Sequence, residues 1–289
     1  MGRGPHLGSR WLVGVAVLSV LLTSCGRFGL NASPPADAGE DGAGDDAAPL
    51  DPCRPDFDED TVLLLTFDSM EGDTFADETG SHIAALTGGD GELVAGPPGC
   101  GMALSLPGTS STGAYVVIDD SPDWDLPAGS VDFWTRFDED GNGGVVGRDE
   151  SGVETDGHLS VIREPEGNLM ARLQADGMIF YRCSDPISSG EWHHVGVNFG
   201  PPTGFELFVD GARADGAGDA HWGDCATSRP VRGTCGRATD AGLSGNRNPW
   251  VLGAYTHDSD PGSAEPAECR MVGAIDHFRI SRVQRDFAR

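Results

Sequence analysis

From residue 61 onward, the sequence consists of short apolar or alternating segments separated by glycine, proline, aspartate and asparagine. Segments of this length between turn-forming residues are typical of β-strands, and no helix longer than a turn or two is expected. Many short strands at regular spacing predict an all-β sandwich. The expected strands are Thr61–Phe67, His82–Leu86, Met102–Leu106, Ala114–Ile118, Ser130–Phe137, Val145–Arg148, His158–Arg163, Asn168–Gln174, Met178–Cys183, Trp192–Phe199, Phe205–Val209, Trp250–Ala254 and Met271–Ile280.

The best strand pattern is an alternation of apolar and charged residues. Val131, Phe133 and Phe137 fall on one face of their strand, and Asp132 and Arg136 fall on the other. A period of two predicts one buried face and one face in contact with water.

The N-terminus has the pattern of an export signal. A basic start precedes the apolar run Trp11–Leu22, which is too short to span a membrane and is typical of a secretory signal peptide. Leu22-Thr23-Ser24-Cys25 resembles the lipobox of bacterial lipoproteins, which implies cleavage after residue 24 and acylation of Cys25. Because Gly26 follows, the resemblance implies the outer membrane or cell surface of a Gram-negative bacterium. Ordinary cleavage, with Cys25 left as a thiol, is the alternative.

Composition separates a tether from a folded domain. Residues 25–57 are acidic and rich in proline, glycine and alanine, so they cannot bury enough apolar surface to fold. Residues 58–289 show no internal repeat and are expected to form one domain. The whole chain has 46 acidic and 19 basic residues, a net charge of −27, which argues against a nucleic-acid partner because phosphates would be repelled. Contact with a membrane is expected only through Cys25.

The cysteine count agrees with export. Six cysteines remain besides Cys25, an even number that favours three disulfides in an exported domain, with 15 connectivities open. There is no Cys-x-x-Cys motif, and the thiols are widely dispersed, which argues against a zinc site. The expected pairs are Cys53–Cys100, Cys225–Cys235 and, as the remainder, Cys183–Cys269.

The order of the strand motifs carries a family resemblance. The motifs are Leu63–Asp68, Asp77–His82, Gly101–Gly108, Tyr115–Ile118, Ser130–Phe137, Gly190–Val197, Leu207–Gly211 and Gly273–Ile280. In this order they resemble the laminin-G-like branch of the concanavalin A-like lectin/glucanase superfamily. The resemblance implies a jelly-roll sandwich of two antiparallel sheets, each with six or seven strands, one sheet being concave.

Asp276 is the main candidate for a metal ligand. It is expected to share a strand face with Phe278 and Ile280, so its carboxylate should point inward, where it needs backbone donors, an arginine or a cation. The family resemblance implies a structural calcium where the first and last strands meet, held by Asp276 and Asp68. Hydrogen bonds or an arginine pair at Asp276 are the favoured alternative.

His193 and His194 open one expected strand. Adjacent residues on a strand point to opposite faces, so the two imidazoles are not expected to share a metal ion. One of them should face the core side and bond to a neighbouring loop. We therefore expect structural roles for both.

Catalysis is not expected. Glucanases of the resembled superfamily carry a Glu-x-Asp-x-Glu or Glu-x-Asp-x-x-Glu pattern on one strand, which supplies two carboxylates. Glu154-Thr155-Asp156 begins such a pattern but lacks the second glutamate, and neither Gly-x-Ser-x-Gly nor His-Glu-x-x-His occurs. Glycoside hydrolysis is therefore the least favoured function for the chain.

The favoured function is a non-catalytic module that binds carbohydrate or another extracellular ligand. Trp124, Trp222 and Trp250 are candidates for stacking on sugars, although each also suits packing. The segment Ala212–Pro249 is the least family-like part and is where a specific site is expected. A protein-binding adhesion module and a structural envelope module without sugar binding are the alternatives.

Overall fold

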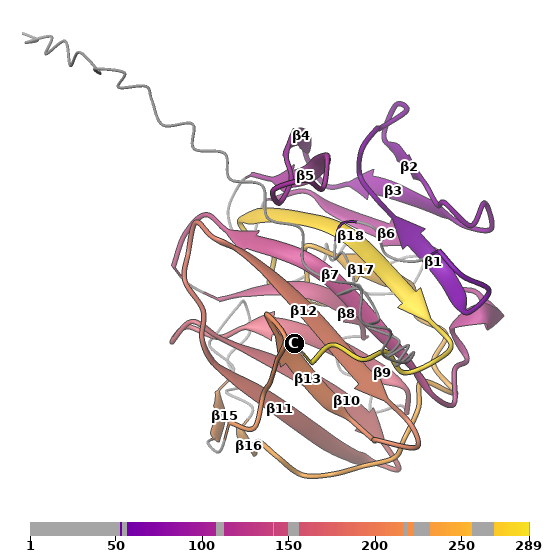
Figure 1. Cartoon of the computed structure of the whole chain (residues 1–289), viewed down its shortest axis with the longest axis vertical. Coiled ribbons are helices and arrows are strands. Elements are labelled where there is room, and N and C mark those ends of the chain that lie inside the picture. The colour runs from indigo at the N-terminus through magenta and orange to yellow at the C-terminus, as the bar shows by residue number, and fades with distance from the viewer. Residues whose placement is uncertain are drawn as a thin grey trace, which may run out of the picture. The chain divides into compact units, whose positions relative to one another are not determined.

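Two antiparallel β-sheets face each other in the computed structural model of the chain (Figure 1). The structure describes residue 53 and residues 57–107, 113–140, 142–149, 156–216, 219–221, 232–255 and 269–288. These residues belong to one unit that spans Ala47–Arg289. No helix among them is long and apolar enough to cross a membrane. The signal segment, Cys25 and Trp222 lie outside the described residues.

The first sheet, called sheet 1, contains the C-terminal strand at its centre. In spatial order its strands are β14 (Ala212–Arg213), β13 (Glu206–Val209), β12 (Trp192–Phe199), β7 (Gly129–Phe137), β18 (Gly273–Ser281), β5 (Met102–Leu106) and β4 (Glu92–Ala95). In addition, β1 (Thr61–Leu65) joins sheet 1 by pairing with β18.

The second sheet, called sheet 2, lies across the core from sheet 1. In spatial order sheet 2 contains β11 (Met178–Pro186), β10 (Asn168–Ala175), β9 (His158–Arg163), β8 (Gly143–Arg148), β17 (Trp250–Leu252), β6 (Tyr115–Ile118), β3 (Ile83–Thr87) and β2 (Thr74–Ala76).

Two elements lie outside the two large sheets. A separate two-stranded ribbon pairs β15 (Asp219–His221) with β16 (Arg232–Thr234), and the only described helix is the 3-10 turn η1 (Pro122–Trp124).

The all-β sandwich predicted from the sequence is confirmed, but each of the two sheets has eight strands rather than the six or seven that the resemblance implies. Each of the thirteen expected segments contains a strand, with ends that differ by a few residues. The sequence does not predict β2, β4, β14, β15 and β16, because each has four residues or fewer and lacks a clear alternation.

The core between the sheets is apolar. Val131 and Phe133 of β7 are fully buried there, as the alternation predicts. Across the core, the ring of Trp250 on β17 meets that of Phe278 on β18 edge-on, with centroids 5.9 Å apart. Each aromatic ring removes a large apolar area from water, and burial is worth about 25 cal/mol per Å².

The outer face of β7 corrects one expectation. Asp132 is only 4% exposed, not in contact with water as the alternation predicts. It lies opposite Arg279 of β18 in the register, and the guanidinium donates two hydrogen bonds to its carboxylate at 2.8 and 3.0 Å. Burial alone would raise the pKa of Asp132, but His194 and Arg279 outweigh burial and hold the pKa below its usual value. A buried charge with good partners is tolerated.

A second buried polar cluster lies on the outer face of sheet 2. The carboxylate of Asp149 is 2.5 Å from Nδ1 of His158, pairs with Arg172, and accepts a hydrogen bond of 3.0 Å from the hydroxyl of Tyr255. Gly147 of β8 allows this approach, because a Cβ there would lie 1.9 Å from the carbonyl oxygen of Tyr255. The cluster therefore fastens the segment at Tyr255 onto sheet 2.

The disulfide between Cys53 and Cys100 is confirmed. Their Cα atoms are 4.7 Å apart, and the bond ties the segment before β1 to the turn between β4 and β5. With a sequence separation of 47 between the cysteines, the lost entropy of the unfolded chain is worth about 4 kcal/mol in the loop-closure model.

The other two expected disulfides are wrong. Cys183 of β11 pairs with Cys235, not with Cys269, so Cys235 is not bonded to Cys225. Cys183 and Cys235 meet through a contact between segments that are distant in the sequence. A parallel bridge between Tyr181 and Cys235 brings the segment after β16 against the edge of β11. Cys269 is also disulfide-bonded, and Cys225 lies outside the described residues.

The Asp132–Arg279 pair yields a stability prediction. Replacing Arg279 with leucine leaves the buried carboxylate without its main partner, so we expect the free energy of unfolding in urea to fall by about 3–5 kcal/mol. The matched control is Arg136→Leu on the same sheet, which removes a partly exposed pair with Asp138 and should cost about 1 kcal/mol or less. Equal losses in the two variants would contradict the role given to the buried pair.

Candidate functional site

A groove lies where the edges of the two sheets approach each other. Its volume is about 660 Å³, and it is lined by residues 184–188 at the end of β11, by residues 209–210 and 212–216 around β13 and β14, and by His193 of β12. The lining from residue 212 onward comes from the start of the segment that the sequence singled out.

A tight turn and a histidine build one wall of the groove. Asp210 and Gly211 join β13 to β14 and have φ values of 51° and 82°, which is the backbone of a two-residue type I′ hairpin. The Asp210 carboxylate accepts a hydrogen bond of 2.8 Å from the backbone N–H of His194 and lies 2.7 Å from Nδ1 of His193. Nε2 of His193 lies 3.2 Å from both the hydroxyl and the carbonyl oxygen of Ser188.

The electrostatics of this wall favour a charged imidazole. The hydrogen bond that the Asp210 carboxylate accepts from His193 raises the pKa of His193 above 6.5, and this effect outweighs burial. Burial alone would raise the pKa of Asp210, but the hydrogen bonds from His193 and from the His194 backbone leave it below its usual value. His193 is thus fixed between a turn and a loop, as expected for one member of the histidine pair.

The polar contacts of the wall run in a line from Ser188 through His193 to Asp210. This order resembles a catalytic triad of nucleophile, base and orienting acid. The hydroxyl of Ser188, however, donates a hydrogen bond of 2.5 Å to Glu191. An imidazole whose pKa is raised holds its proton, so it is a poor acceptor for the proton of a serine. This geometry suits fixed polar contacts to a ligand better than activation of a nucleophile.

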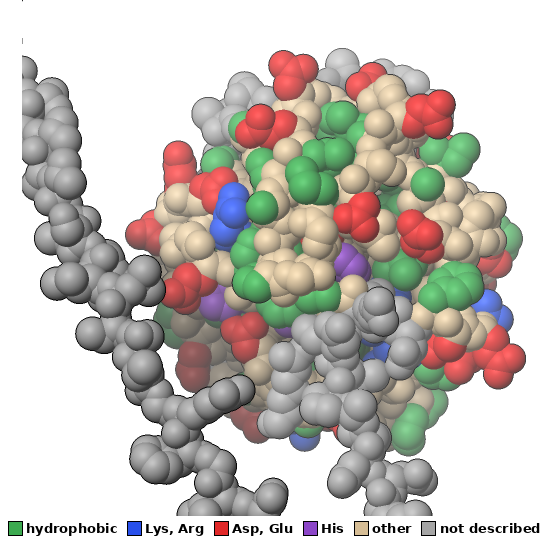
Figure 2. Space-filling model, turned by 45° about the horizontal axis from the view of Figure 1, so that its top comes forward, with side chains coloured by type: hydrophobic (Ala, Val, Ile, Leu, Met, Phe, Trp, Pro, Cys, Tyr) green, Lys and Arg blue, Asp and Glu red, His purple; other side chains and the backbone are tan. Residues whose placement is uncertain are grey.

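The rim of the groove is charged. Arg213 of β14 is half exposed and pairs with Glu206 at 3.0 Å and with Asp215 at 3.4 Å. Asp185, on the opposite wall, is exposed. Acidic side chains also outnumber basic ones on the face of the molecule shown in Figure 2. The groove therefore offers both donors and acceptors with little net positive charge.

The predicted metal ligand Asp276 lies at a bulge in β18. The register of β18 against β7 gains one residue between Asp276 and Arg279, and His277 has a φ of 47°. The extra residue reverses the alternation of faces along β18. Ile275 and Phe278 both face the core, and Asp276 therefore lies on the other face of the strand. The expectation of an inward carboxylate is wrong, although Asp276 is fully buried.

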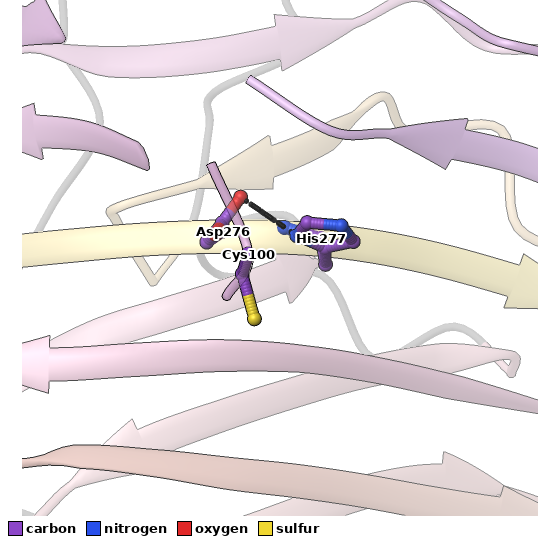
Figure 3. A group of neighbouring side chains, drawn as sticks. All are labelled: Cys100, Asp276 and His277. Carbon is purple, nitrogen blue, oxygen red and sulfur yellow. Dashed lines mark hydrogen bonds and ion pairs between the residues drawn. The ribbon is translucent and has the colours of Figure 1, made fainter. Parts of the chain in front are cut away.

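The turn between β4 and β5 covers Asp276. A Cβ on Gly96 would lie 2.7 Å from Oδ2 of Asp276, so only glycine leaves room there. Oδ1 accepts a hydrogen bond of 2.8 Å from the backbone N–H of His277, whereas Oδ2 has no partner among the described residues. Burial raises the pKa of Asp276 to about 6, against the opposing effect of His277. Figure 3 shows Asp276 and His277 facing each other beside Cys100.

Asp68, the other residue that the resemblance implies for calcium, reaches the same turn. Its carboxylate accepts a hydrogen bond of 2.9 Å from the backbone N–H of Met102, and its charge contributes to the raised pKa of Asp276. Calcium takes six to eight oxygen ligands, and this place offers two carboxylates and the nearby backbone carbonyls. The unpartnered Oδ2 atom of Asp276 is the feature that fits a bound cation.

The tryptophans do not form the expected stacking surface. Trp124 and Trp250 are fully buried in the core, so neither offers a ring face to a sugar. The indole of Trp124 donates to the carbonyl of Asp119 at 3.0 Å and packs against His82. Trp222 lies outside the described residues. Sequence reasoning did not identify the groove, because it forms only where the end of β11 in sheet 2 approaches β13 and β14 in sheet 1, and no local pattern signals that approach.

Comparison with known proteins agrees with the fold. A family model described as the concanavalin A-like lectin/glucanases superfamily matches residues 110–286. Among solved structures, the binding domain of botulinum neurotoxin DC in complex with rat synaptotagmin II is 10% identical, with a TM-score of 0.51, and the match covers 79% of this chain and 49% of that chain. No curated protein matches the sequence.

Two further solved structures share the fold. The binding domain of Paraclostridial Mosquitocidal Protein 1 is 14% identical, with a TM-score of 0.51, and the match covers 79% of this chain and 50% of that one. Trypanosoma rangeli sialidase is 15% identical, with a TM-score of 0.50, and the match covers 79% of this chain and 31% of that one. This chain thus spans half or less of the length of these three structures, and the likeness concerns the fold.

The His193–Asp210 pair yields a pH prediction. Because the pKa of His193 is raised by folding, its stabilising effect is complete below pH 6.5 and is lost as the pH rises through the higher pKa of the folded state. We expect the difference in unfolding free energy between wild type and His193→Gln to shrink as the pH rises above 6.5. Urea unfolding over a pH series measures it. A difference that grows with pH would contradict the assignment of a charged imidazole.

Proposed function

The chain belongs to the concanavalin A-like lectin/glucanase superfamily, and from this premise we propose that it binds a carbohydrate without catalysis in the groove between β11 and β14. The observation that carries the proposal is the groove itself. Its volume lies within the range of about 300–1,000 Å³ that is usual for ligand sites.

The chemistry of the groove supports a sugar ligand. Sugar hydroxyls are both donors and acceptors, and Asp185, Ser188 and Arg213 present fixed groups of both kinds. Ile187 and Val209 add apolar wall that suits the C–H face of a sugar ring. Specific sites combine such an apolar lining with a few well-placed polar groups.

Binding without catalysis is supported by the carboxylates. The start of the glucanase-like pattern includes Asp156, whose carboxylate accepts a hydrogen bond of 3.2 Å from the backbone N–H of Gly177. In the groove, Ser188 donates its proton to Glu191 rather than toward a free base. The sequence also lacks the second glutamate of the glucanase pattern, so that segment does not supply the pair of carboxylates that the pattern uses for glycoside hydrolysis.

A protein ligand is the second candidate. The botulinum neurotoxin DC binding domain, which has the same fold, was solved in complex with synaptotagmin II, which is a protein. For this chain, a protein partner would use the same rim residues without needing a sugar-sized groove.

The proposal includes the location and an ion. Acylation of Cys25 would hold the domain at the outer membrane or cell surface of a Gram-negative bacterium, with residues 26–57 as spacer. Calcium held by Asp68 and Asp276 would stabilise the turn between β4 and β5.

A glycan array tests the proposed ligand. We expect the purified chain to bind a defined set of glycans and Arg213→Ala to weaken that binding about tenfold, which corresponds to about 1.4 kcal/mol. The matched control is Arg247→Ala, an exposed arginine that does not line the groove. Repeating the array with a calcium chelator separates an effect of calcium on binding from the groove contacts.

The outcomes of the array are distinct. Equal weakening by Arg213→Ala and Arg247→Ala would place the sugar outside the groove. Binding of no glycan in either condition would contradict the carbohydrate proposal and favour the protein ligand.

Lipidation is tested by metabolic labelling. In a Gram-negative host, the wild-type chain should incorporate labelled palmitate and sediment with the outer membrane, because acyl chains on Cys25 anchor it. Cys25→Ser should incorporate no label and remain in the soluble fraction. Labelling that persists in Cys25→Ser would contradict acylation at this residue.

A further inference from the structure

Three different metal-binding groups meet at the bulge of β18. Sγ of Cys100, a carboxylate oxygen of Asp276 and a ring nitrogen of His277 lie within 4.8 Å of one another. Cys100 comes from the turn between β4 and β5, and the other two residues come from β18 (Figure 3). All three residues are buried.

Two of these groups have a polar atom without a hydrogen bond among the described residues. Oδ2 of Asp276 and Nδ1 of His277 are such atoms, and their residues are 0% and 6% exposed. Nδ1 nevertheless forms an ion pair with Oδ1 of Asp276 at 3.0 Å, whereas Oδ2 has no partner of either kind among the described residues. A buried polar atom without a partner is costly, and a bound cation would satisfy Oδ2.

The third group, the sulfur of Cys100, is unavailable to a metal while it is part of a disulfide. In the structure Cys100 is joined to Cys53, so its sulfur is not a thiolate. Reduction of this disulfide would leave a thiolate, an imidazole and a carboxylate around one point. Zinc binds sulfur, nitrogen and carboxylate ligands in a tetrahedral site, whereas calcium requires oxygen ligands.

We propose that Cys100, Asp276 and His277 form a zinc site that becomes available when the Cys53–Cys100 disulfide is reduced. A dithiol reductant supplies two electrons and two protons and is itself oxidised to a disulfide. The thiol of Cys100 then releases its proton as sulfur binds the metal. Water or a backbone carbonyl completes the fourth position.

The orientation of His277 agrees with this site. The imidazole is hydrogen-bonded to the backbone of Cys53, which supports the ring next to the disulfide. Metal-binding histidines commonly use one ring nitrogen for the metal and the other for such a carbonyl. The site is independent of the groove, so it neither requires nor excludes the proposed carbohydrate ligand. It shares Asp276 with the proposed calcium site, so zinc and calcium are alternative occupants of that carboxylate.

Cobalt is the probe for the experiment, because thiolate ligation of Co²⁺ produces a sulfur-to-metal charge-transfer band. The full chain is used with Cys25→Ser, which removes the other expected free thiol. Adding Cys53→Ser frees Cys100 while leaving the other disulfides intact. We expect this double variant to bind one equivalent of Co²⁺ with the charge-transfer band, and zinc to displace the cobalt and abolish the band.

Matched controls decide the ligand set. Cys25→Ser alone, with the disulfide intact, should show no charge-transfer band, and adding Cys100→Ser or Asp276→Asn to the double variant should remove or weaken it. Cobalt binding that is unchanged by Cys100→Ser would overturn the site. Absence of binding in a double variant that retains the native near-ultraviolet circular dichroism would also overturn it.

A second measurement does not depend on the Cys53 variant. Zinc should slow alkylation of Cys100 at least tenfold in the Cys25→Ser chain after mild reduction by a dithiol. Peptide mapping reads Cys100 separately from Cys183 and Cys235. Equal alkylation rates of Cys100 with and without zinc would overturn the proposal even if the double variant fails to fold.

Discussion

The position of β18 in sheet 1 is the constraint on which the rest of the domain depends. β7 pairs along one edge of β18, while β5 pairs with the first part of the other edge and β1 with the last part. The buried Asp132–Arg279 pair fixes the register with β7, because a slip by one residue would leave both charges without partners. The first, middle and last parts of the chain therefore meet at one strand.

The bulge in β18 gathers polar side chains at one place on this strand. It lies between the parts of the edge that pair with β5 and with β1, so the turn before β5 can fold over it. The extra residue places Asp276 and His277 under that turn, next to the disulfide of Cys100. The groove has a different origin, because it lies at the far edge of sheet 1, where the Asp210–Gly211 turn holds His193.

Sequence patterns predicted what depends on local order. Alternation and turn residues located the strands, and the order of motifs indicated the jelly roll, because both signals lie within short segments. The Cys53–Cys100 pair followed from its place beside two early strands. Cys183–Cys235 did not, since a parallel bridge to β11 has no local signal. The reversal at Asp276 was missed, because counting by two assumes a strand without a bulge. Trp124 lies in the turn η1, where no alternation could show whether its ring is buried or exposed.

The domain is proposed to hold its ligand in the groove at the sheet edges. Nuclear magnetic resonance of the labelled chain, titrated with a glycan that it binds, tests this location most directly. We expect the largest amide shifts in residues 184–188 and 209–216 and at His193, with β18 unaffected. Shifts that cluster instead on the outer face of sheet 2, around Tyr255, would contradict it.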